Sequence, residues 1–337
     1  MDSLSQLALG AAVSEAMIGK KVGRKASVWG AVLGTFPDLD VFIPMGSSIA
    51  DFVYHRSFSH SFLILGLCAP LWAWFIARCH QHDSGMRKSW FAVCLAVFYT
   101  HILLDSITIY GTQIFWPFSS YPISIGSIFI VDPIYTLPLL FGVLVYLTSR
   151  KAFGYRANII GLGISTLYLL WTMTIQAHVR SITLDNLQRN NLPWANVLVT
   201  PTPFNSFLWR LVSIDQNGYH VGYFSIFDES KEIPFRFISS SYEMVDSLNK
   251  DQEVQDLMVF THGFFTIDRR GNDWVVSDIR MGVEPGYVFQ FAVAQNSDAG
   301  IKFIEPYRYP PPRNLGRLGS MLERIFDERI PMLPAND

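Results

Sequence analysis

The chain has 337 residues, of which 50% are hydrophobic and only 16% are charged, and its mean hydropathy is +0.24. Soluble domains carry about 25% charged residues, so this composition argues against a typical soluble enzyme. The formal net charge of −2 argues against the basic face that a nucleic-acid-binding protein needs, and no nucleic-acid partner is expected. The only cysteines are Cys68, Cys79 and Cys94, so neither a disulfide framework nor a cysteine-based zinc site is predicted.

Apolar segments of nearly the ~20 residues that a bilayer requires occur in the first half of the chain. Four of them are predicted to span a membrane: 61–77, 89–109, 128–148 and 157–177. Two shorter segments, 4–19 and 26–36, are rich in alanine and glycine and predict a helical hairpin, either fully crossing or re-entrant. The start of the chain lacks the basic region of a cleaved signal peptide, so we expect it to be retained. Residues 1–178 are thus predicted to form a polytopic α-helical membrane domain with four to six membrane segments.

Basic residues in the connections between these segments predict the orientation. Every second connection is basic, and together these connections contain Lys20, Lys21, Arg24, Lys25, Arg78, Arg87, Lys88, Arg150, Lys151 and Arg156. The intervening connections, 37–60 and 106–127, contain only Arg56. Because short loops rich in lysine and arginine stay in the cytoplasm, we expect a multi-pass protein of a bacterial inner membrane whose residues after 178 are extracytoplasmic.

The composition changes near residue 180, where strand-like alternation begins. Two predicted hairpins turn at Asn217-Gly218 and Gly271-Asn272, and the charged stretch 242–261 predicts a helix between them. Residues 179–337 are therefore predicted to form a soluble, extracytoplasmic α+β domain with an antiparallel sheet, of ordinary domain size. An extended tail and a short helix are expected to close the chain.

Ionisable side chains gather at the predicted outer ends of the membrane segments. The motifs FPDLD, YHRSFSHS, YTHILLDS and FIVDPIY contribute Asp38, Asp40, His55, His60, His101, Asp105 and Asp132. Such groups are costly to bury in a membrane, and by default they mark a functional site. Histidine and aspartate suit Zn²⁺, with Mn²⁺ or Fe²⁺ as alternatives, and the spacing of His101 and Asp105 places both on one helical face. The number of candidate ligands is sufficient for one or two divalent ions.

Each of these residues also has a purely structural interpretation. The alternatives are a turn at Asp38, a helix start at Asp132, headgroup contacts of His55 and His60, and a self-satisfied pair of His101 with Asp105. The predicted topology nevertheless places all of them on one face of the membrane, and this coincidence favours a metal site. Glu15 is interpreted as an acid that extends toward Lys20 or Lys21, with a role near the metal as the alternative.

Several of these motifs together resemble a known family. The segments MDSLSQLALGAAVSEAMIGKKVG, WGAVLGTFPDLDV, YHRSFSHS and HILLDS are similar to the inner-membrane-associated, metal-dependent hydrolases called YdjM-like or LexA-regulated. The resemblance covers residues 1 to about 180, and TPTPFNSFLWRLV resembles the outer extension of one branch. It implies a membrane hydrolase with metal ligands at Asp38, Asp40, His55, His60, His101 and Asp105. Many members carry a histidine near the N-terminus, where this chain has Ser5-Gln6, so Gln6 is at most a weak ligand.

We therefore expect metal-assisted hydrolysis at the outer membrane interface, on a lipid-linked substrate such as a phosphoester, with membrane lipid as a partner. The spacing of His101 and Asp105 also resembles that in zinc-dependent phospholipases C and related nucleases, by analogy only. Asp40 or Asp105 is expected to accept a proton as general base. Arg56 is expected to clamp the anionic substrate, with anchoring to a lipid phosphate as the alternative.

Two other classes of function stay open, as does the oligomeric state. A metal-ion or solute transporter also needs acids and histidines within the membrane, but would place them near the midplane on discontinuous helices. A non-catalytic scaffold would use a structural metal, which is closed by four protein ligands, whereas a catalytic metal keeps one position open to water.

Overall fold

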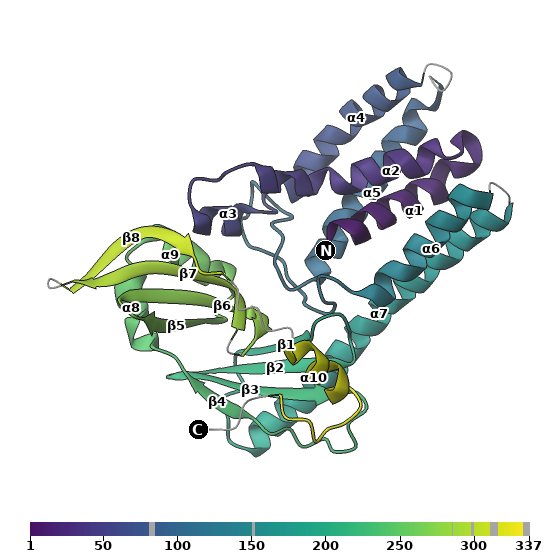
Figure 1. Ribbon diagram of the computed structural model, residues 1–337. Helices are drawn as coiled ribbons and strands as arrows, with labels where there is room; N and C mark the ends of the chain where they lie inside the picture. Colours follow the sequence, from purple (N-terminus) through teal and green to yellow (C-terminus); the bar gives the residue numbers. More distant parts are fainter. Residues whose placement is uncertain (81–84, 150–151, 285, 298–299, 311–315, 333–337) are drawn as a thin grey trace. The chain divides into compact units, whose positions relative to one another are not determined.

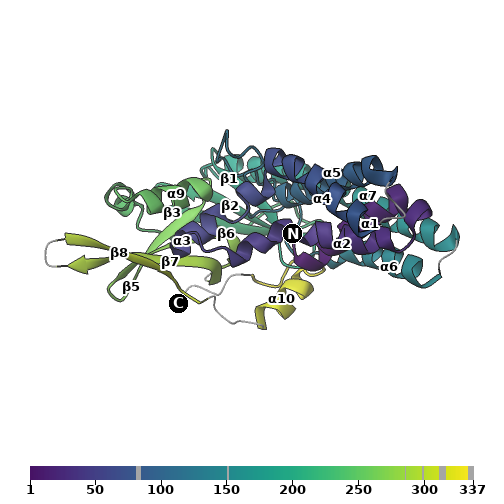
Figure 2. The same cartoon turned by 90° about the horizontal axis from the view of Figure 1, so that it is seen from above.

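The computed structural model describes residues 1–80, 85–149, 152–284, 286–297, 300–310 and 316–332. The chain divides into two compact units (Figures 1 and 2). The first, called the helical unit below, comprises Met1–Ile43 and Arg56–Met173. The second, the sheet unit, comprises Pro44–His55 and Thr174–Asp337.

The helical unit consists of long helices joined by short turns (Figure 1). Its elements are α1 (Ser3–Val22), α2 (Lys25–Thr35), η1 (Pro37–Phe42), η2 (Phe58–His60), α4 (Phe62–Cys79), α5 (Arg87–Ile107), α6 (Pro133–Ser149) and the first part of α7 (Ala152–Arg189). α1 packs against α2, α5 and α6, and α5 also packs against α4, so α1 and α5 hold the unit together. The Asp2 side chain caps α1 by accepting hydrogen bonds from the backbone N–H groups of Leu4 and Ser5.

Three helices are long and apolar enough to cross a membrane, namely α4, α5 and α7. α6 is apolar, and its described part has 17 residues. The Asp132 side chain accepts hydrogen bonds from the N–H groups of Ile134 and Tyr135 and starts the helix there. α2 has 11 residues, and α1 carries polar side chains that lower its hydropathy. The helical first half is confirmed, whereas the expected count of four to six membrane segments is not.

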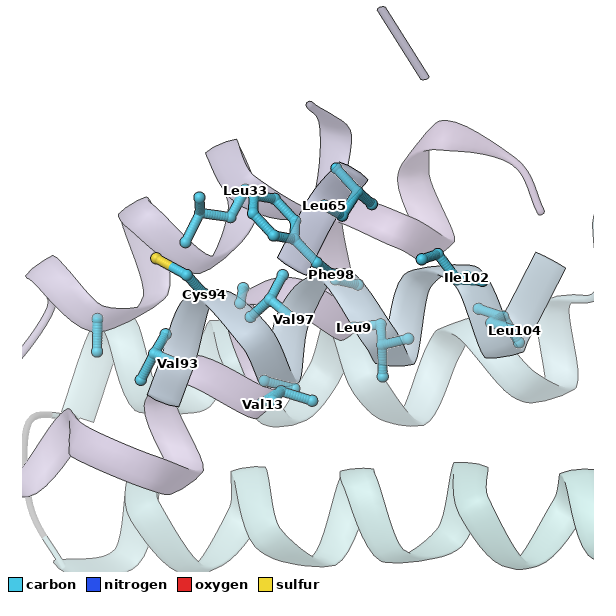
Figure 3. Packing of buried hydrophobic residues seen from close by; sticks show 14 of the residues in the cluster. Leu9, Val13, Leu33, Leu65, Val93, Cys94, Val97, Phe98, Ile102 and Leu104 are labelled. Carbon is cyan, nitrogen blue, oxygen red and sulfur yellow. The ribbon is translucent and has the colours of Figure 1, made fainter. Parts of the chain in front are cut away.

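The interior of the helical unit is a cluster of buried apolar side chains. Figure 3 shows those that α1, α2, α4 and α5 contribute, among them Leu9, Val13, Leu33, Leu65, Val93, Val97, Phe98 and Ile102. On α5 the buried positions recur every three or four residues, which is the spacing of one helical face. Whatever side chain continues this face toward the end of α5 is therefore buried as well.

Glycines allow α1 and α2 to touch along their backbones. A Cβ on Gly30 would overlap the carbonyl oxygen of Gly10 and would lie 2.6 Å from the Cβ of Ser14. A Cβ on Gly34 would lie 3.2 Å from the Cα of Gly10. Small residues at such crossings let helices associate by close van der Waals contact. The sequence prediction of a tight helical hairpin agrees with this packing.

The sheet unit contains two four-stranded antiparallel sheets, with strand orders β1-β2-β3-β4 and β5-β6-β7-β8 (Figure 1). The strands are β1 (Val197–Pro201), β2 (Leu208–Asp215), β3 (Gly218–Ser225), β4 (Arg236–Ser239), β5 (Phe265–Arg270), β6 (Asp273–Val283), β7 (Gly286–Ser297) and β8 (Gly300–Arg308). Both predicted hairpins are present, since Asp215 pairs with Gly218 and Arg270 pairs with Asp273. The remaining helices are α3 (Ser48–Tyr54), η4 (Tyr242–Met244), α8 (Val245–Leu248), α9 (Gln252–Phe260) and α10 (Gly316–Arg324).

Two features of the sheet unit differ from what the sequence predicts. The stretch 242–261 is not one helix, because the Asp251 side chain caps a new helix, α9, through the N–H groups of Glu253 and Val254. The segment 44–55, which lies between the first apolar segments, is part of the sheet unit. It is held there by α3, where Phe52 packs against three aromatic rings: Phe260, Phe289 and Phe291.

A buried ion pair joins the two sheets. The Arg210 guanidinium on β2 pairs with the Glu284 carboxylate at the end of β6 and donates a hydrogen bond to the Ile279 carbonyl at 2.7 Å. Glu284 also accepts a hydrogen bond from the Tyr223 hydroxyl at 2.9 Å. Burial alone would raise the pKa of Glu284, but the Arg210 charge holds it below its ordinary value. The pair is thus charged and satisfied between the sheets.

We expect Gly30→Ala to destabilise the helical unit, because the new Cβ would overlap α1. Overpacking of this kind costs about 1–3 kcal/mol, which exceeds the ~1 kcal/mol that alanine gains over glycine inside a helix. Gly163→Ala on α7 is the matched control, since its Cβ would meet no described atom within 4 Å. Thermal unfolding in detergent compares the two, and equal melting temperatures would contradict the close α1–α2 contact.

Candidate metal centre

Four of the predicted ligands converge in the helical unit. Asp38 on η1, His60 on η2, and His101 and Asp105 on α5 each offer a ligand atom, and these atoms all lie within 4.8 Å of one another. The Nε2 atom of His60 lies 3.1 Å from His101 Nε2 and 3.1 Å from Asp105 Oδ2. His101 Nε2 lies 3.3 Å from Asp105 Oδ2. Asp38 Oδ1 lies 3.4 Å from His60 Nε2 and 3.6 Å from His101 Nε2.

The two ligands on α5 continue the buried face of that helix. Trp90, Val97 and Phe98 occupy this face in the preceding turns, and His101 and Asp105 follow at the same helical spacing. Both are at most 1% exposed. A face that is otherwise apolar thus ends in an imidazole and a carboxylate, and this pattern is the signal by which a sequence can reveal a buried site.

Hydrogen bonds fix the proton positions on both imidazoles. His101 Nδ1 lies 2.7 Å from the Gly34 carbonyl oxygen, which can only accept, so Nδ1 carries a proton. The Ser59 hydroxyl donates its single proton to Asp40 Oδ2 at 2.5 Å and must therefore accept from His60 Nδ1 at 2.9 Å. In both rings Nε2 is then the ligand atom, and the hydrogen bond at Nδ1 orients the ring, as is usual for metal-binding histidines.

Asp40 is not a member of the group of four, but its carboxylate orients one member, His60. Its Oδ2 atom accepts hydrogen bonds from the Arg56 backbone N–H at 2.9 Å and from the Ser59 hydroxyl, and it lies 3.7 Å from His60 Nδ1. Arg56 has a left-handed backbone with φ 64°, which an arginine adopts only when surrounding contacts hold it there. Asp40 thus fixes the turn that presents His60.

The second oxygen of Asp105 is held by donors. Its Oδ1 atom accepts a hydrogen bond from Gln6 Nε2 at 3.0 Å, lies 3.3 Å from Arg56 Nη1, and contacts the α-amino group of Met1. The Arg56 guanidinium also lies over the Tyr110 ring, at 5.0 Å from its centroid, and the residue is only 5% exposed. These contacts leave Oδ2 facing the other three ligands.

The donor set fits a divalent cation. Ligand atoms at about 2.0–2.1 Å from a tetrahedral zinc ion lie about 3.3–3.4 Å apart. The five spacings that involve an imidazole are 3.1–3.6 Å, and the two carboxylate oxygens lie within 4.8 Å of each other. Within the described part of the chain, Asp38 Oδ2 and Asp105 Oδ2 are buried oxygens without a hydrogen-bond donor. Burial raises the pKa of Asp38, but hydrogen bonds from His101 and His60 outweigh this and hold the pKa below its ordinary value. If no cation is bound, protons on the imidazoles must neutralise the negative charge of the two carboxylates.

The other predicted residues lie outside the group of four. His55 ends the segment 44–55, which belongs to the sheet unit. Asp132 caps α6 and accepts a hydrogen bond from the Tyr168 hydroxyl at 2.9 Å, in agreement with its structural interpretation as a helix start. Gln6 contacts the site as a donor to Asp105. Sequence reasoning did not find Gly34, because a backbone carbonyl carries no signal of its own in the sequence.

Comparison with known proteins agrees with this picture of the first half of the chain. Residues 1–179, which include all four converging residues, match the family model described as YdjM inner membrane protein. Comparisons with curated proteins and with solved structures gave no significant match. Because the family match covers more than half of the 337 residues and the helical unit has helices that could span a membrane, the chain belongs to the YdjM inner membrane protein family.

Proposed function

We propose that this protein is a membrane-bound, metal-dependent hydrolase that acts on a lipid-linked phosphoester at the outer face of the inner membrane. The observation that carries the proposal is the convergence of Asp38, His60, His101 and Asp105 at the end of an apolar helical unit. Polar groups of this kind are retained inside a membrane protein when they have a function. The loop charges support the orientation, because the basic connections lie at the other end of the helices.

These four side chains would hold one divalent cation. Two imidazole nitrogens and two carboxylate oxygens suit Zn²⁺ best, with Mn²⁺ or Fe²⁺ as alternatives. When bound, such an ion supplies a Lewis acid that activates water and stabilises negative charge on a phosphoryl oxygen. One ion is favoured over two, because Asp40 is engaged by Ser59 and by the Arg56 backbone.

The protein's own side chains supply the proton acceptor and orient the ligands. Asp38 is the only one of the four whose side chain reaches solvent, with 15% exposure against at most 1% for the others. Asp38 would therefore be the ligand that gives up its position to an incoming water molecule and accepts a proton from it, while His60, His101 and Asp105 keep hold of the ion. Arg56, expected to clamp the substrate, is buried against Asp105 and acts instead by keeping that carboxylate ionised and oriented. Asp40, expected to act as base, orients His60 through Ser59.

Apolar side chains beside the site support a substrate with a lipid part. On η1, Leu39, Val41 and Phe42 are 51%, 66% and 80% exposed, and they are next to Asp38 in the chain. In a membrane these side chains suit the interface between headgroups and acyl chains. A phosphoester whose lipid chains stay in the bilayer would reach Asp38 from this side.

A structural metal is the second candidate. Four protein ligands close a tetrahedral zinc site, and a closed site is typical of structural zinc rather than of catalysis. In this alternative the ion would fasten η1 and η2 to α5, and the protein would bind metal without turnover. Metal content and hydrolysis therefore need to be measured separately.

We expect the purified protein to contain about one divalent metal ion per chain, because the four ligands form a single tetrahedral set. His101→Ala removes one ligand and is expected to lower the bound metal severalfold or more. His178→Ala, an exposed histidine on α7, is the matched control and should leave it unchanged. Elemental analysis by mass spectrometry gives the result. Equal metal content in both variants would show that the group of four does not bind the ion.

Hydrolysis should depend on Asp38. Metal-loaded protein in detergent is expected to hydrolyse bis(p-nitrophenyl) phosphate or phospholipid vesicles, and Asp38→Asn is expected to lower the rate by about 10²–10⁴-fold through loss of the proton acceptor. Asp185→Asn, an exposed residue on α7, is the control. If metal-loaded wild-type protein turns over neither substrate while retaining its ion, the structural-metal alternative is favoured. An Asp38→Asn rate equal to wild type would contradict the assigned role.

A further inference from the structure

A basic cavity lies at the end of the helical unit opposite the metal centre. Its volume is about 870 Å³, and it opens where the α1–α2 turn meets the facing ends of α6 and α7. The described lining residues are Gly19, Lys20, Gly23, Arg24, Lys25, Tyr146, Ala152, Tyr155 and Arg156. Figure 1 shows these helix ends on the side away from the N-terminus.

The cavity carries a concentrated positive charge. Four of its lining residues, Lys20, Arg24, Lys25 and Arg156, are cationic, and no acidic residue is among the described residues that line it. One buried acid, Glu15, lies against the lining residue Gly19. A Cβ on Gly19 would overlap its carboxylate, and Ser27 Oγ donates to it at 3.3 Å. Four like charges around one hollow repel one another, so an anion between them lowers the electrostatic energy.

The walls of the cavity are fixed by tyrosines. The Tyr146 hydroxyl donates to the Gly19 carbonyl oxygen at 3.1 Å, and the Tyr155 hydroxyl donates to the Ala16 carbonyl oxygen at 3.2 Å. These bonds tie Tyr146 on α6 and Tyr155 on α7 to the last two turns of α1 and so hold the walls of the cavity together. The Lys20 ammonium lies 4.1 Å from the Tyr155 ring centroid, a cation–π contact that positions it.

The basic connections that predict the cytoplasmic side of the membrane also supply the charges of the cavity, namely Lys20, Arg24, Lys25 and Arg156. α1 runs from the candidate metal centre to this cavity, and its 20 residues give it a length of about 30 Å. Gln6 near its start contacts the metal-centre residue Asp105, and Lys20 near its end lines the cavity. Basic pockets between membrane helices on the cytoplasmic side are suited to phosphate-bearing lipid headgroups.

We propose that this cavity binds the phosphodiester of an anionic lipid headgroup. The cavity is within the range of ligand-binding pockets, about 300–1,000 Å³, and is larger than a lone phosphate needs. The acyl chains of such a lipid would remain in the bilayer beside α6 and α7, whose exposed faces are apolar at Leu144 and Phe153. The site is distinct from the metal centre and does not depend on the hydrolase proposal.

The test uses the full-length protein in detergent and counts bound lipid by native mass spectrometry. Dioleoylphosphatidylglycerol is compared with dioleoylphosphatidylcholine, which carries a phosphate but no net charge, and with inorganic phosphate as a competitor. We expect the anionic lipid to be retained preferentially, and millimolar phosphate not to displace it. Equal retention of the two lipids, or full displacement by inorganic phosphate, would overturn the assignment to an anionic lipid.

Paired variants separate the cavity from general surface charge. Lys20→Ala/Arg156→Ala is expected to weaken phosphatidylglycerol binding roughly 10- to 30-fold, since each basic side chain near a lipid surface contributes about fivefold. The control Arg87→Ala/Lys88→Ala removes the same charge from exposed residues on α5 that do not line the cavity. Ala152→Phe keeps every charge but fills the cavity, and it decides the question if the first variant misfolds. Equal binding by all three variants would refute the proposal.

Discussion

The structure of the helical unit depends on one electrostatic constraint: two carboxylates and two imidazoles face each other in an apolar interior. Asp105 and His60 are fully buried, and their facing atoms are 3.1 Å apart. An isolated ionised group in such a place costs several kcal/mol, so the group must be neutralised by protons or by a cation. Arg56 and Gln6 lie against Oδ1 of Asp105 and offset its negative charge, whereas Oδ2 faces the other members of the group of four. A divalent ion and protons on the imidazoles are the two ways to balance this charge, and metal analysis of the protein distinguishes them.

The way in which the chain assembles this group explains how much of it could be predicted from sequence. The pair His101–Asp105 could be predicted because a four-residue spacing on a helix fixes two side chains on one face. Asp38 and His60 were placed near the pair by the loop-charge topology alone. His55 is not one of the four, and its motif does not reveal this. It ends the segment 44–55, which Phe52 ties to aromatic rings of the sheet unit more than 200 residues further along the chain.

Other differences have equally local physical causes. Asp40 and Asp38 are two residues apart, and only the three-dimensional turn decides which one faces the site and which one accepts hydrogen bonds from the segment that presents His60. Hydropathy alone placed the start of the segment that became α6 too early, because hydropathy does not detect the cap that Asp132 provides. The tertiary structure decides which hydrogen-bond partners these aspartates have, and local sequence patterns do not predict those partners.

α1 connects the two ends of the helical unit, and its packing limits what each end can do. It approaches α2 at the Gly10–Gly30 contact with no room for a side chain, so α1 cannot shift against α2 without losing that contact. Its first turns supply Gln6 to the metal centre and its last turn supplies Lys20 to the basic cavity. α1 thus fixes the separation between the carboxylate–imidazole group and the cationic cavity, which is about 21 Å along the helix axis from Gln6 to Lys20. One helix therefore gives a hydrogen-bond donor to a buried carboxylate at one end and a cation to the cavity at the other, so a displacement of α1 would move both sites together.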